Sequence, residues 1–224
     1  MSKAKNYFAW QARLVRREIG RRVIEVGCGI GNFTRMLLDR DAVVALDVEP
    51  ACVERLLQRY PNQPNLQAHS FGAASPEFAR LASLQPDSCV CLNVLEHVAD
   101  DRRAVAAMAD VLIPGGSVVL LLPAFPSLEG PIDRNLGHFR RYHSTDVYAL
   151  AKAAGLRIRK MHFMNCVGLC GWWANAHLLR LEANPEWQIA LFDNLLVPLL
   201  SRLEAIVPPP FGQSLFVVLE KPCP

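Results

Sequence analysis

The stretch VIEVGCGIGNF, Val23–Phe33, places three glycines between an apolar run and the expected start of a helix. The apolar, β-branched residues before the glycines predict a short strand. A glycine-rich turn after a strand lets a ligand approach the backbone closely. A nicotinamide dinucleotide requires the spacing G-x-G-x-x-G. The glycines here are Gly27, Gly29 and Gly31, and Asn32 stands where the third dinucleotide glycine would be.

Two acidic residues limit the ligand further. Glu25 lies two residues before the first glycine, where a carboxylate would repel a bound pyrophosphate but attract a cation. S-adenosylmethionine carries a sulfonium and an ammonium group and no phosphate. Asp47 ends the next predicted strand, and a carboxylate there can accept hydrogen bonds from both hydroxyls of a ribose. The glycine spacing and Glu25 together favour a cationic, phosphate-free nucleoside over NAD.

Strands and helices alternate along the rest of the chain, which predicts a mostly parallel sheet with helices on both faces. The expected strands are residues 22–27, 42–50, 65–72, 87–98, 116–124, 156–163 and 213–221. The expected helices are residues 7–20, 32–40, 51–60, 75–82, 100–113 and 145–155. We therefore predict one Rossmann-like α/β domain over residues 1–224, with a seven-stranded sheet. Residues 165–212 form an insert of expected helices before the last strand.

Composition narrows the class of function. The 24 Lys and Arg and 21 Asp and Glu residues give a net charge of +3, smaller than nucleic-acid enzymes usually carry. Seven cysteines lack paired or zinc-ligand spacing, which predicts core thiols in a reducing compartment and no metal centre. The start of the sequence shows no secretion leader, so we expect a cytoplasmic protein. Residues 161–179 lack acidic and basic side chains, but their histidines, asparagines and glycines favour a core or substrate-facing helix over a membrane span.

As a set, four motifs resemble those of class I S-adenosylmethionine-dependent methyltransferases, in particular the small-molecule branch that includes the ubiquinone-pathway O-methyltransferases. The motifs are VIEVGCGIGNF, ALDVEP, CLNVLEHV and LIPGGSVVLLLP. The resemblance covers residues 7–122 and extends less closely through GHFRRYHSTDV. It implies a methyltransferase that uses S-adenosylmethionine, releases S-adenosylhomocysteine and acts on a small molecule.

The resemblance also implies which residues hold the cofactor. Gly27 and Gly29 would let the backbone approach its methionine part, with Glu25 beneath. Asp47 would hold the ribose and Val48 would lie against the adenine. The remaining predicted cofactor contacts are Tyr7, Cys28 and Asn93. An acid that often binds the adenine amino group in this family is absent after the third strand, where HSFGAAS offers small and neutral residues.

Residues 124–145 form the predicted active-site loop. Methyl transfer from a sulfonium to a hydroxyl requires alignment, a dry site and removal of the acceptor's proton. His138 occupies the position that resembles the family's active-site histidine, and we predict that it is the base; a loop histidine with only local bonds is the alternative. The predicted substrate-binding residues are Asp133, Arg140, Arg141 and Tyr142. Two adjacent arginines suggest a carboxylate or phosphate on the acceptor; a solvated loop surface or an ion pair with Asp133 is the alternative.

The sequence leaves several functions open. The expected reaction is O-methylation of an amphipathic or anionic metabolite, with N- or C-methylation as alternatives. A protein that binds S-adenosylmethionine without methylating, such as a cyclase or a scaffold, is a second reading, and an NAD-dependent oxidoreductase is a third. The apolar insert could be a lid, a homodimer contact or a peripheral contact with a membrane or lipid-like substrate.

Overall fold

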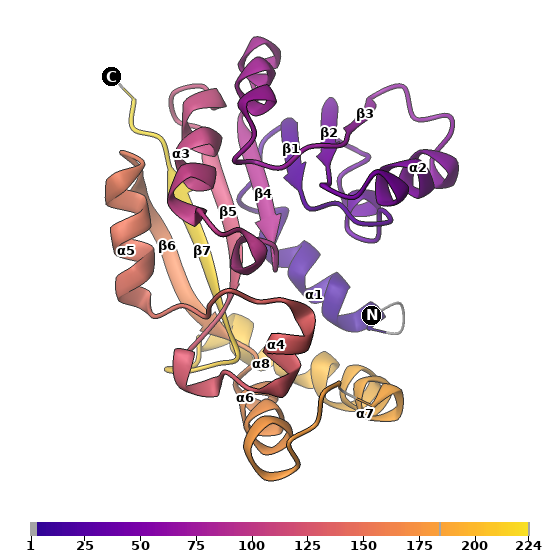
Figure 1. The fold of residues 1–224 in the computed structure, drawn as a ribbon, viewed down its shortest axis with the longest axis vertical. Coiled ribbons are helices and arrows are strands. Elements are labelled where there is room, and N and C mark those ends of the chain that lie inside the picture. The colour runs from indigo at the N-terminus through magenta and orange to yellow at the C-terminus, as the bar shows by residue number, and fades with distance from the viewer. Residues whose placement is uncertain (1–3, 184, 224) are drawn as a thin grey trace.

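A seven-stranded sheet forms the centre of the computed structural model, which describes residues 4–183 and 185–223. The strand order is β3-β2-β1-β4-β5-β7-β6; β7 runs antiparallel to β5 and β6, and the other pairs are parallel. The strands are β1 Arg22–Val26, β2 Ala42–Leu46, β3 Leu66–His69, β4 Ser88–Leu92, β5 Ser117–Pro123, β6 Arg157–Met164 and β7 Ser214–Glu220. The predicted Rossmann-like α/β fold is confirmed (Figure 1).

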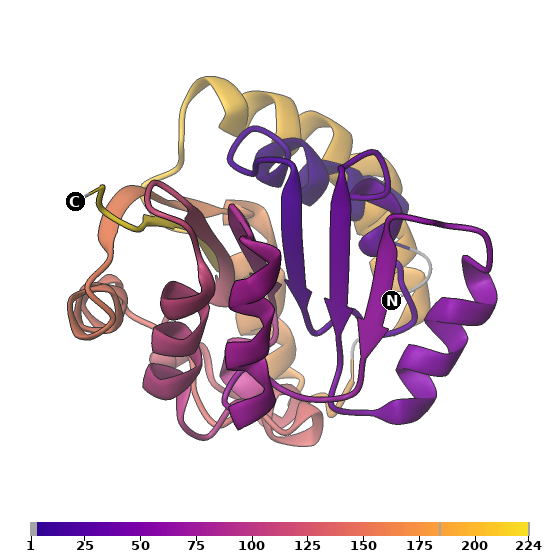
Figure 2. The ribbon, with the colours of Figure 1, turned by 90° about the horizontal axis from the view of Figure 1, so that it is seen from above.

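Helices cover both faces of this sheet, as Figure 2 shows. The α-helices are α1 Lys5–Val15, α2 Pro50–Arg59, α3 Asp101–Val111, α4 Pro131–Leu136, α5 Ser144–Ala153, α6 Cys166–Trp173, α7 Glu186–Leu191 and α8 Val197–Ile206. Shorter 3-10 segments are η1 Thr34–Met36, η2 Pro76–Leu84, η3 Leu95–His97 and η4 Pro126–Leu128, and two π-helical turns are η5 Ala174–Leu178 and η6 Phe192–Leu196.

Alternating side chains along each strand divide the core into two layers. On β1, Ile24 and Val26 face a cluster that includes residues of α3, α5 and η2. Val23 faces the other cluster, to which α1 contributes Trp10 and α8 contributes Leu200. Because both faces are buried, the central strands are almost continuously apolar, as parallel sheets require.

One predicted helix is wrong. The chain between β1 and β2 was expected to form a helix over residues 32–40, but it forms turns around η1, Thr34–Met36. Phe33, Thr34 and Leu37 are buried there, and the Thr34 hydroxyl donates a 2.6 Å hydrogen bond to Glu25 Oε2. Burial of these side chains and the Thr34–Glu25 hydrogen bond stabilise this segment in a conformation that is not a regular α-helix.

Between β6 and β7 the chain forms a bundle of helices at one end of the molecule, from α6 to α8 (Figure 1). Asp193 in η6 accepts hydrogen bonds from the backbone N–H groups of Asn6 (3.0 Å) and Tyr7 (2.8 Å). Glu204 of α8 accepts hydrogen bonds from the N–H groups that begin α6. Among the described residues, no helix has the length and apolar character needed to cross a membrane.

Candidate active site

The glycine turn after β1 meets the segment after β4 at the carboxyl edge of the sheet. Gly27 has φ +78°, and a Cβ atom there would lie 2.2 Å from Cγ2 of Val94. A Cβ at Gly29, with φ +52°, would meet no atom within 4 Å. Gly27 is therefore required by close packing between two loops, whereas Gly29 leaves open space beside the backbone.

Asp47 connects the end of β2 to this turn. Its Oδ2 accepts a 2.8 Å hydrogen bond from the N–H of Gly29, and its Oδ1 accepts one of 3.0 Å from the N–H of Glu49. The side chain of Val48 is 75% exposed next to it. A carboxylate and an exposed apolar side chain therefore lie side by side at the end of β2, which suits a ribose and a base.

Glu25 lies under the turn and is only 3% exposed. Burial raises its pKa to about 8, and the hydrogen bond from Thr34 opposes part of that rise. The carboxyl group is therefore mostly protonated at pH 7. A cation bound above the turn would favour the carboxylate, because opposite charges stabilise each other.

The other predicted cofactor residues have partners within the protein. Cys28 is buried near Ala45, and burial raises the pKa of its thiol. The hydroxyl of Tyr7 bonds to side chains that include Ser214, and burial raises its pKa. Asn93 adopts φ +52°, and its N–H donates to the carbonyl of Leu121 at 2.9 Å. Cofactor contacts by these three residues stay predictions.

These residues fit S-adenosylmethionine. The open backbone at Gly29 admits a ligand, Asp47 offers ribose acceptors, and Glu25 supplies a buried acid that a sulfonium or ammonium group would favour in its charged form. None of these groups is a cation that would hold a pyrophosphate.

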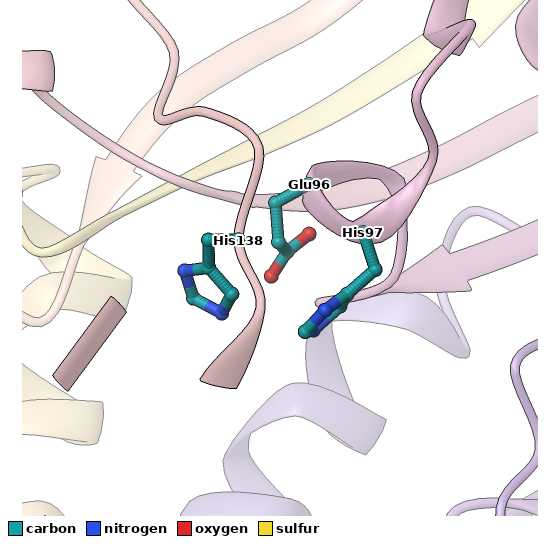
Figure 3. Close-up of side chains that lie close together, drawn as sticks. All are labelled: Glu96, His97 and His138. Carbon is teal, nitrogen blue, oxygen red and sulfur yellow. The ribbon is translucent and has the colours of Figure 1, made fainter. Parts of the chain in front are cut away.

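His138 lies in the loop after α4 and is held by a buried acid. Its Nδ1 is 2.9 Å from Oδ1 of Asp133, whose side chain is 1% exposed. Oδ2 of Asp133 accepts a 2.9 Å hydrogen bond from the N–H of Gly130. Because a carboxylate oxygen accepts, Nδ1 carries the proton of this hydrogen bond, and in the neutral ring the free lone pair is then on Nε2. Figure 3 shows the His138 ring beside Glu96 and His97.

Glu96 and His97 belong to η3, directly after β4. One possible ligand atom from each of Glu96, His97 and His138 lies within 4.8 Å of the other two. Glu96 is 1% exposed, its Oε2 has no hydrogen-bond partner among the described residues, and burial raises its pKa to about 7. Burial is also the main cause of the lowered pKa of His97. Sequence reasoning missed Glu96 and His97 as site residues; the Glu-His pair at the end of a strand was the available signal.

The predicted substrate-binding side chains are all engaged within the protein. Arg141 is 4% exposed; its Nε lies 2.8 Å from Oδ1 of Asp133, and its guanidinium stacks 4.7 Å from the ring centre of Trp172. Arg140 forms a 2.7 Å ion pair with Asp101, to which the hydroxyl of Tyr142 also donates. Asp133, Arg140, Arg141 and Tyr142 thus build the loop that carries His138, and direct contact with substrate stays a prediction for them.

Two surface hollows lie near the candidate site, one beside the loop that carries His138 and one beside the glycine turn. One of about 360 Å³ lies against α3 and α5 and is lined by Asp101, Arg102, Arg140, Arg141, Tyr142, Asp146, Ala149 and Leu150. The other, of about 230 Å³, lies between α1, η1 and α2 and is lined by Lys5, Phe8, Asn32, Arg35, Met36 and Arg59. The second hollow adjoins the glycine turn, since Arg59 donates to the carbonyl of Ile30 at 3.2 Å. It combines three cations with two apolar side chains.

A family model described as a methyltransferase domain matches residues 4–161. The chain belongs to this methyltransferase family. The match includes the glycine turn, Asp47, Glu96, His97 and His138, and it ends before the helical insert. Together with the fold and the relatives below, it identifies a class I S-adenosylmethionine-dependent methyltransferase, as the sequence motifs predict.

Curated relatives are also named methyltransferases. The methyltransferase is 30% identical to a Mycolicibacterium smegmatis protein named "Probable S-adenosylmethionine-dependent methyltransferase", over 65% of this chain and 56% of the relative. It is 33% identical to a ubiquinone biosynthesis O-methyltransferase of Aromatoleum aromaticum, over 44% of this chain and 42% of the relative. The matches thus span about half the length of these relatives.

A solved structure supports the fold. The N-methyltransferase NodS of Bradyrhizobium japonicum, in complex with S-adenosylhomocysteine, superposes with a TM-score of 0.59. The alignment covers 94% of this chain and 85% of NodS at 16% identity. At that identity the likeness concerns the fold alone.

Proposed function

We propose that this methyltransferase transfers a methyl group from S-adenosylmethionine to an oxygen atom of a small, amphipathic, anionic molecule. The observation that carries the proposal is the buried Asp133–His138 pair, which directs Nε2 of a histidine into the site formed by η3. That site follows β4, whose next segment packs on the glycine turn through Val94 and Gly27. A proton acceptor beside the cofactor turn is what O-methylation requires.

The cofactor supplies an activated methyl group when it is bound. Asp47 accepts hydrogen bonds from the ribose, Gly29 leaves room for the backbone approach, and Glu25 balances positive charge from below. Val48 covers the adenine. Tyr7, Cys28 and Asn93 complete the proposed cofactor contacts.

His138 performs the proton transfer. Nε2 takes the proton of the acceptor hydroxyl as its oxygen forms a bond to the methyl carbon. Bound S-adenosylmethionine would supply that carbon, and its sulfur would keep the electron pair of the broken bond, leaving S-adenosylhomocysteine. Asp133 holds the ring in place during this transfer through its contact with Nδ1.

The anionic end of the acceptor fits the hollow between α1, η1 and α2. Arg140 and Arg141 are already paired with Asp101 and Asp133. Lys5 and Arg35 line the hollow and have no hydrogen-bond or ion-pair partner among the described residues. Phe8 and Met36 supply the apolar part of the wall, so we assign recognition of a carboxylate or phosphate on an apolar molecule to this hollow.

The test compares His138→Ala with His177→Ala, which changes an exposed histidine of η5. Calorimetry with S-adenosylmethionine measures cofactor binding, and S-adenosylhomocysteine formation is followed with a panel of phenols and alcohols that carry a carboxylate or phosphate. We expect His138→Ala to keep its cofactor affinity and to lose about 10² to 10⁴ in turnover. His177→Ala should match the unmodified protein.

Three results would overturn the proposal. Failure of the unmodified protein to bind S-adenosylmethionine would remove the enzymatic role altogether. Turnover by His138→Ala that equals the unmodified protein between pH 6 and 9 would remove the base. Binding without any S-adenosylhomocysteine formation, across acceptors with oxygen, nitrogen and carbon nucleophiles, would support a cofactor-binding protein that does not methylate.

A further inference from the structure

The geometry points to a divalent transition-metal ion bound by Glu96, His97 and His138. The three side chains present one carboxylate and two imidazoles to a common point, with ligand atoms within 4.8 Å of one another. The rings of His97 and His138 meet edge to face with their centroids 4.7 Å apart, and the carboxylate of Glu96 lies beside both (Figure 3). Two imidazoles and one carboxylate are a donor set that proteins use for zinc, manganese and iron.

Hydrogen bonds between two loops bring these donors together. Glu96 and His97 are neighbours in η3, whereas His138 follows α4. The N–H of Phe139 donates to the backbone carbonyl of Glu96 at 2.8 Å, and the N–H of His138 donates to the carbonyl of Asp133 at 3.0 Å. The backbone therefore fixes the His138 loop against η3 without using any of the three donor atoms.

Glu96 is the strongest single indication of a missing partner. Its side chain is almost completely buried, and Oε2 has no hydrogen-bond partner among the described residues. A buried carboxyl oxygen without a partner is costly, because burial removes its hydration without replacement. Arg141, the nearby buried cation, already uses its Nε for Asp133 and a terminal nitrogen for the carbonyl of Ala124. A bound cation would balance the negative charge of Glu96 and give Oε2 a partner.

His138 has the environment of a metal ligand. Metal-binding histidines usually donate their second ring N–H to a carboxylate or carbonyl, which fixes the tautomer and raises the basicity of the ligand nitrogen. Asp133 provides this contact at 2.9 Å, and Asp133 is itself held by Gly130 and Arg141. His138 is thus oriented with Nε2 as its donor.

His97 lies at the open edge of the cluster. Metal–nitrogen and metal–oxygen bonds in such sites are about 2.0–2.2 Å, so the donors must close by on the order of 1 Å around an ion. The ring of His97 contacts the ring of His138, with centroids 4.7 Å apart, and His97 is the exposed member of the three. Its movement can complete the site, and three protein ligands leave further coordination positions for a hydroxyl oxygen.

The chemical role of the ion rests on the proposed function, although its binding does not. An acceptor hydroxyl coordinated to the ion becomes more acidic, because the metal stabilises the oxyanion. With Nε2 of His138 engaged on the metal, the acceptor's proton passes to solvent and the oxygen forms its bond to the methyl carbon. In the ion-free protein, His138 accepts that proton directly. The expectation of no metal centre, made from cysteine spacing, considered zinc–thiolate sites and not this cluster.

The test titrates the chelator-treated protein of 224 residues with Mn²⁺ by calorimetry, and then with Zn²⁺ and Mg²⁺. Mn²⁺ comes first because thiols prefer Zn²⁺, and Cys170 and Cys223 are exposed. We expect one equivalent of Mn²⁺ to bind and Mg²⁺ to bind more weakly. Glu96→Gln and His97→Ala should each weaken Mn²⁺ binding at least a hundredfold, Asp133→Asn by about 10- to 100-fold, and His177→Ala not at all.

The choice of variants also separates loss of a metal ligand from misfolding. Glu96→Gln keeps the shape of the side chain, and its affinity for S-adenosylmethionine reports whether the neighbouring turn is intact. Absence of Mn²⁺ and Zn²⁺ binding to the unmodified protein, or binding that Glu96→Gln leaves unchanged, would overturn the site. Metal binding that depends on Glu96 in a protein without methyl transfer would uphold the site and reject the proposed function instead.

Discussion

Two regions of the molecule differ in how far their apolar side chains are buried: the carboxyl edge of β1, β2 and β4, and the insert between β6 and β7. Around the glycine turn, apolar side chains lie in the core, and short hydrogen bonds join Asp47, Glu25 and Thr34 to their neighbours. In the insert, α6 and α7 contain no fully buried side chain. Trp187 is 66% exposed and Ile206 is 78% exposed. The local sequence motifs account for the conformation of the first region. The conformation of the insert depends on its contacts with the rest of the protein.

The exposed apolar residues of the insert form a regular pattern. From α7 to α8, large apolar side chains that are at least half exposed recur at every fourth position: Trp187, Leu191, Leu195, Leu199 and Leu203. Residues four apart in an α-helix rotate gradually around its axis, because one turn holds fewer than four residues. The wider π-helical turn of η6 reverses part of this rotation, so these side chains stay on one face. The same turn points Asp193 inward to the start of α1. The insert thus has one face that holds α1 and another that is apolar and open.

The insert also reaches the candidate site. Trp172 of α6 stacks on Arg141, which bonds Asp133, which holds His138. The indole N–H of Trp172 donates to the carbonyl of Leu128 at 3.2 Å. The motif region thus carries the proposed cofactor site, whereas the insert supports the loop that carries the proposed base.

The largest expected effect concerns the glycine turn. Gly27→Ala should reduce affinity for S-adenosylmethionine at least a hundredfold in calorimetry, because its Cβ would lie 2.2 Å from Val94 and φ is +78°. Gly155→Ala is the matched control, since Gly155 also has positive φ but no atom lies within 4 Å of its Cβ position. Equal affinities in the two variants would refute the argument from close packing.

The second effect concerns stability and pH. The pKa of Glu25 is about 8 in the folded protein and about 4.5 in the unfolded chain, so the folded state retains a proton that the unfolded state releases between these values. Stability of the cofactor-free protein should therefore fall as pH rises from 5 to 8, by roughly 4 kcal/mol from this group. Glu25→Gln should lack that fall in urea denaturation. Parallel pH profiles for the two proteins would contradict the assignment.

The third effect tests the link between the two regions. Trp172→Leu should lower kcat about tenfold and leave KM for the cofactor unchanged, because only the support of Arg141 and Asp133 is lost. Trp173→Leu changes the neighbouring, 46% exposed indole and should leave kcat unaltered. If both variants behave alike, the insert does not position His138.

The smallest effect concerns the open apolar face. Leu199→Ala should change the free energy of unfolding by less than about 0.5 kcal/mol, because Leu199 is 58% exposed. Its neighbour Leu200 is 8% exposed, and Leu200→Ala should cost about 2–5 kcal/mol. Urea denaturation measures both. A large loss for Leu199→Ala would mean that the exposed face is covered in solution.

Local sequence patterns were sufficient to predict most of the fold. The strand-helix alternation predicted the parallel sheet, and the three glycines predicted an open turn at its edge. Asp47 was predicted at the end of the second strand, and the structure joins it to the turn through the N–H of Gly29. The helix over residues 32–40 failed because contacts of Phe33, Thr34 and Leu37 with the core outweighed the apolar spacing.

Local features of the chain were sufficient to predict the sheet, the glycine turn and the class of cofactor, because strand period, glycine spacing and charge act over a few residues. The tertiary structure alone decided that Arg141 is buried against Trp172, and that Glu96 and His97 meet His138. Those contacts join segments far apart in the chain. They depend on how loops pack at the edge of the sheet, and no local pattern encodes that packing.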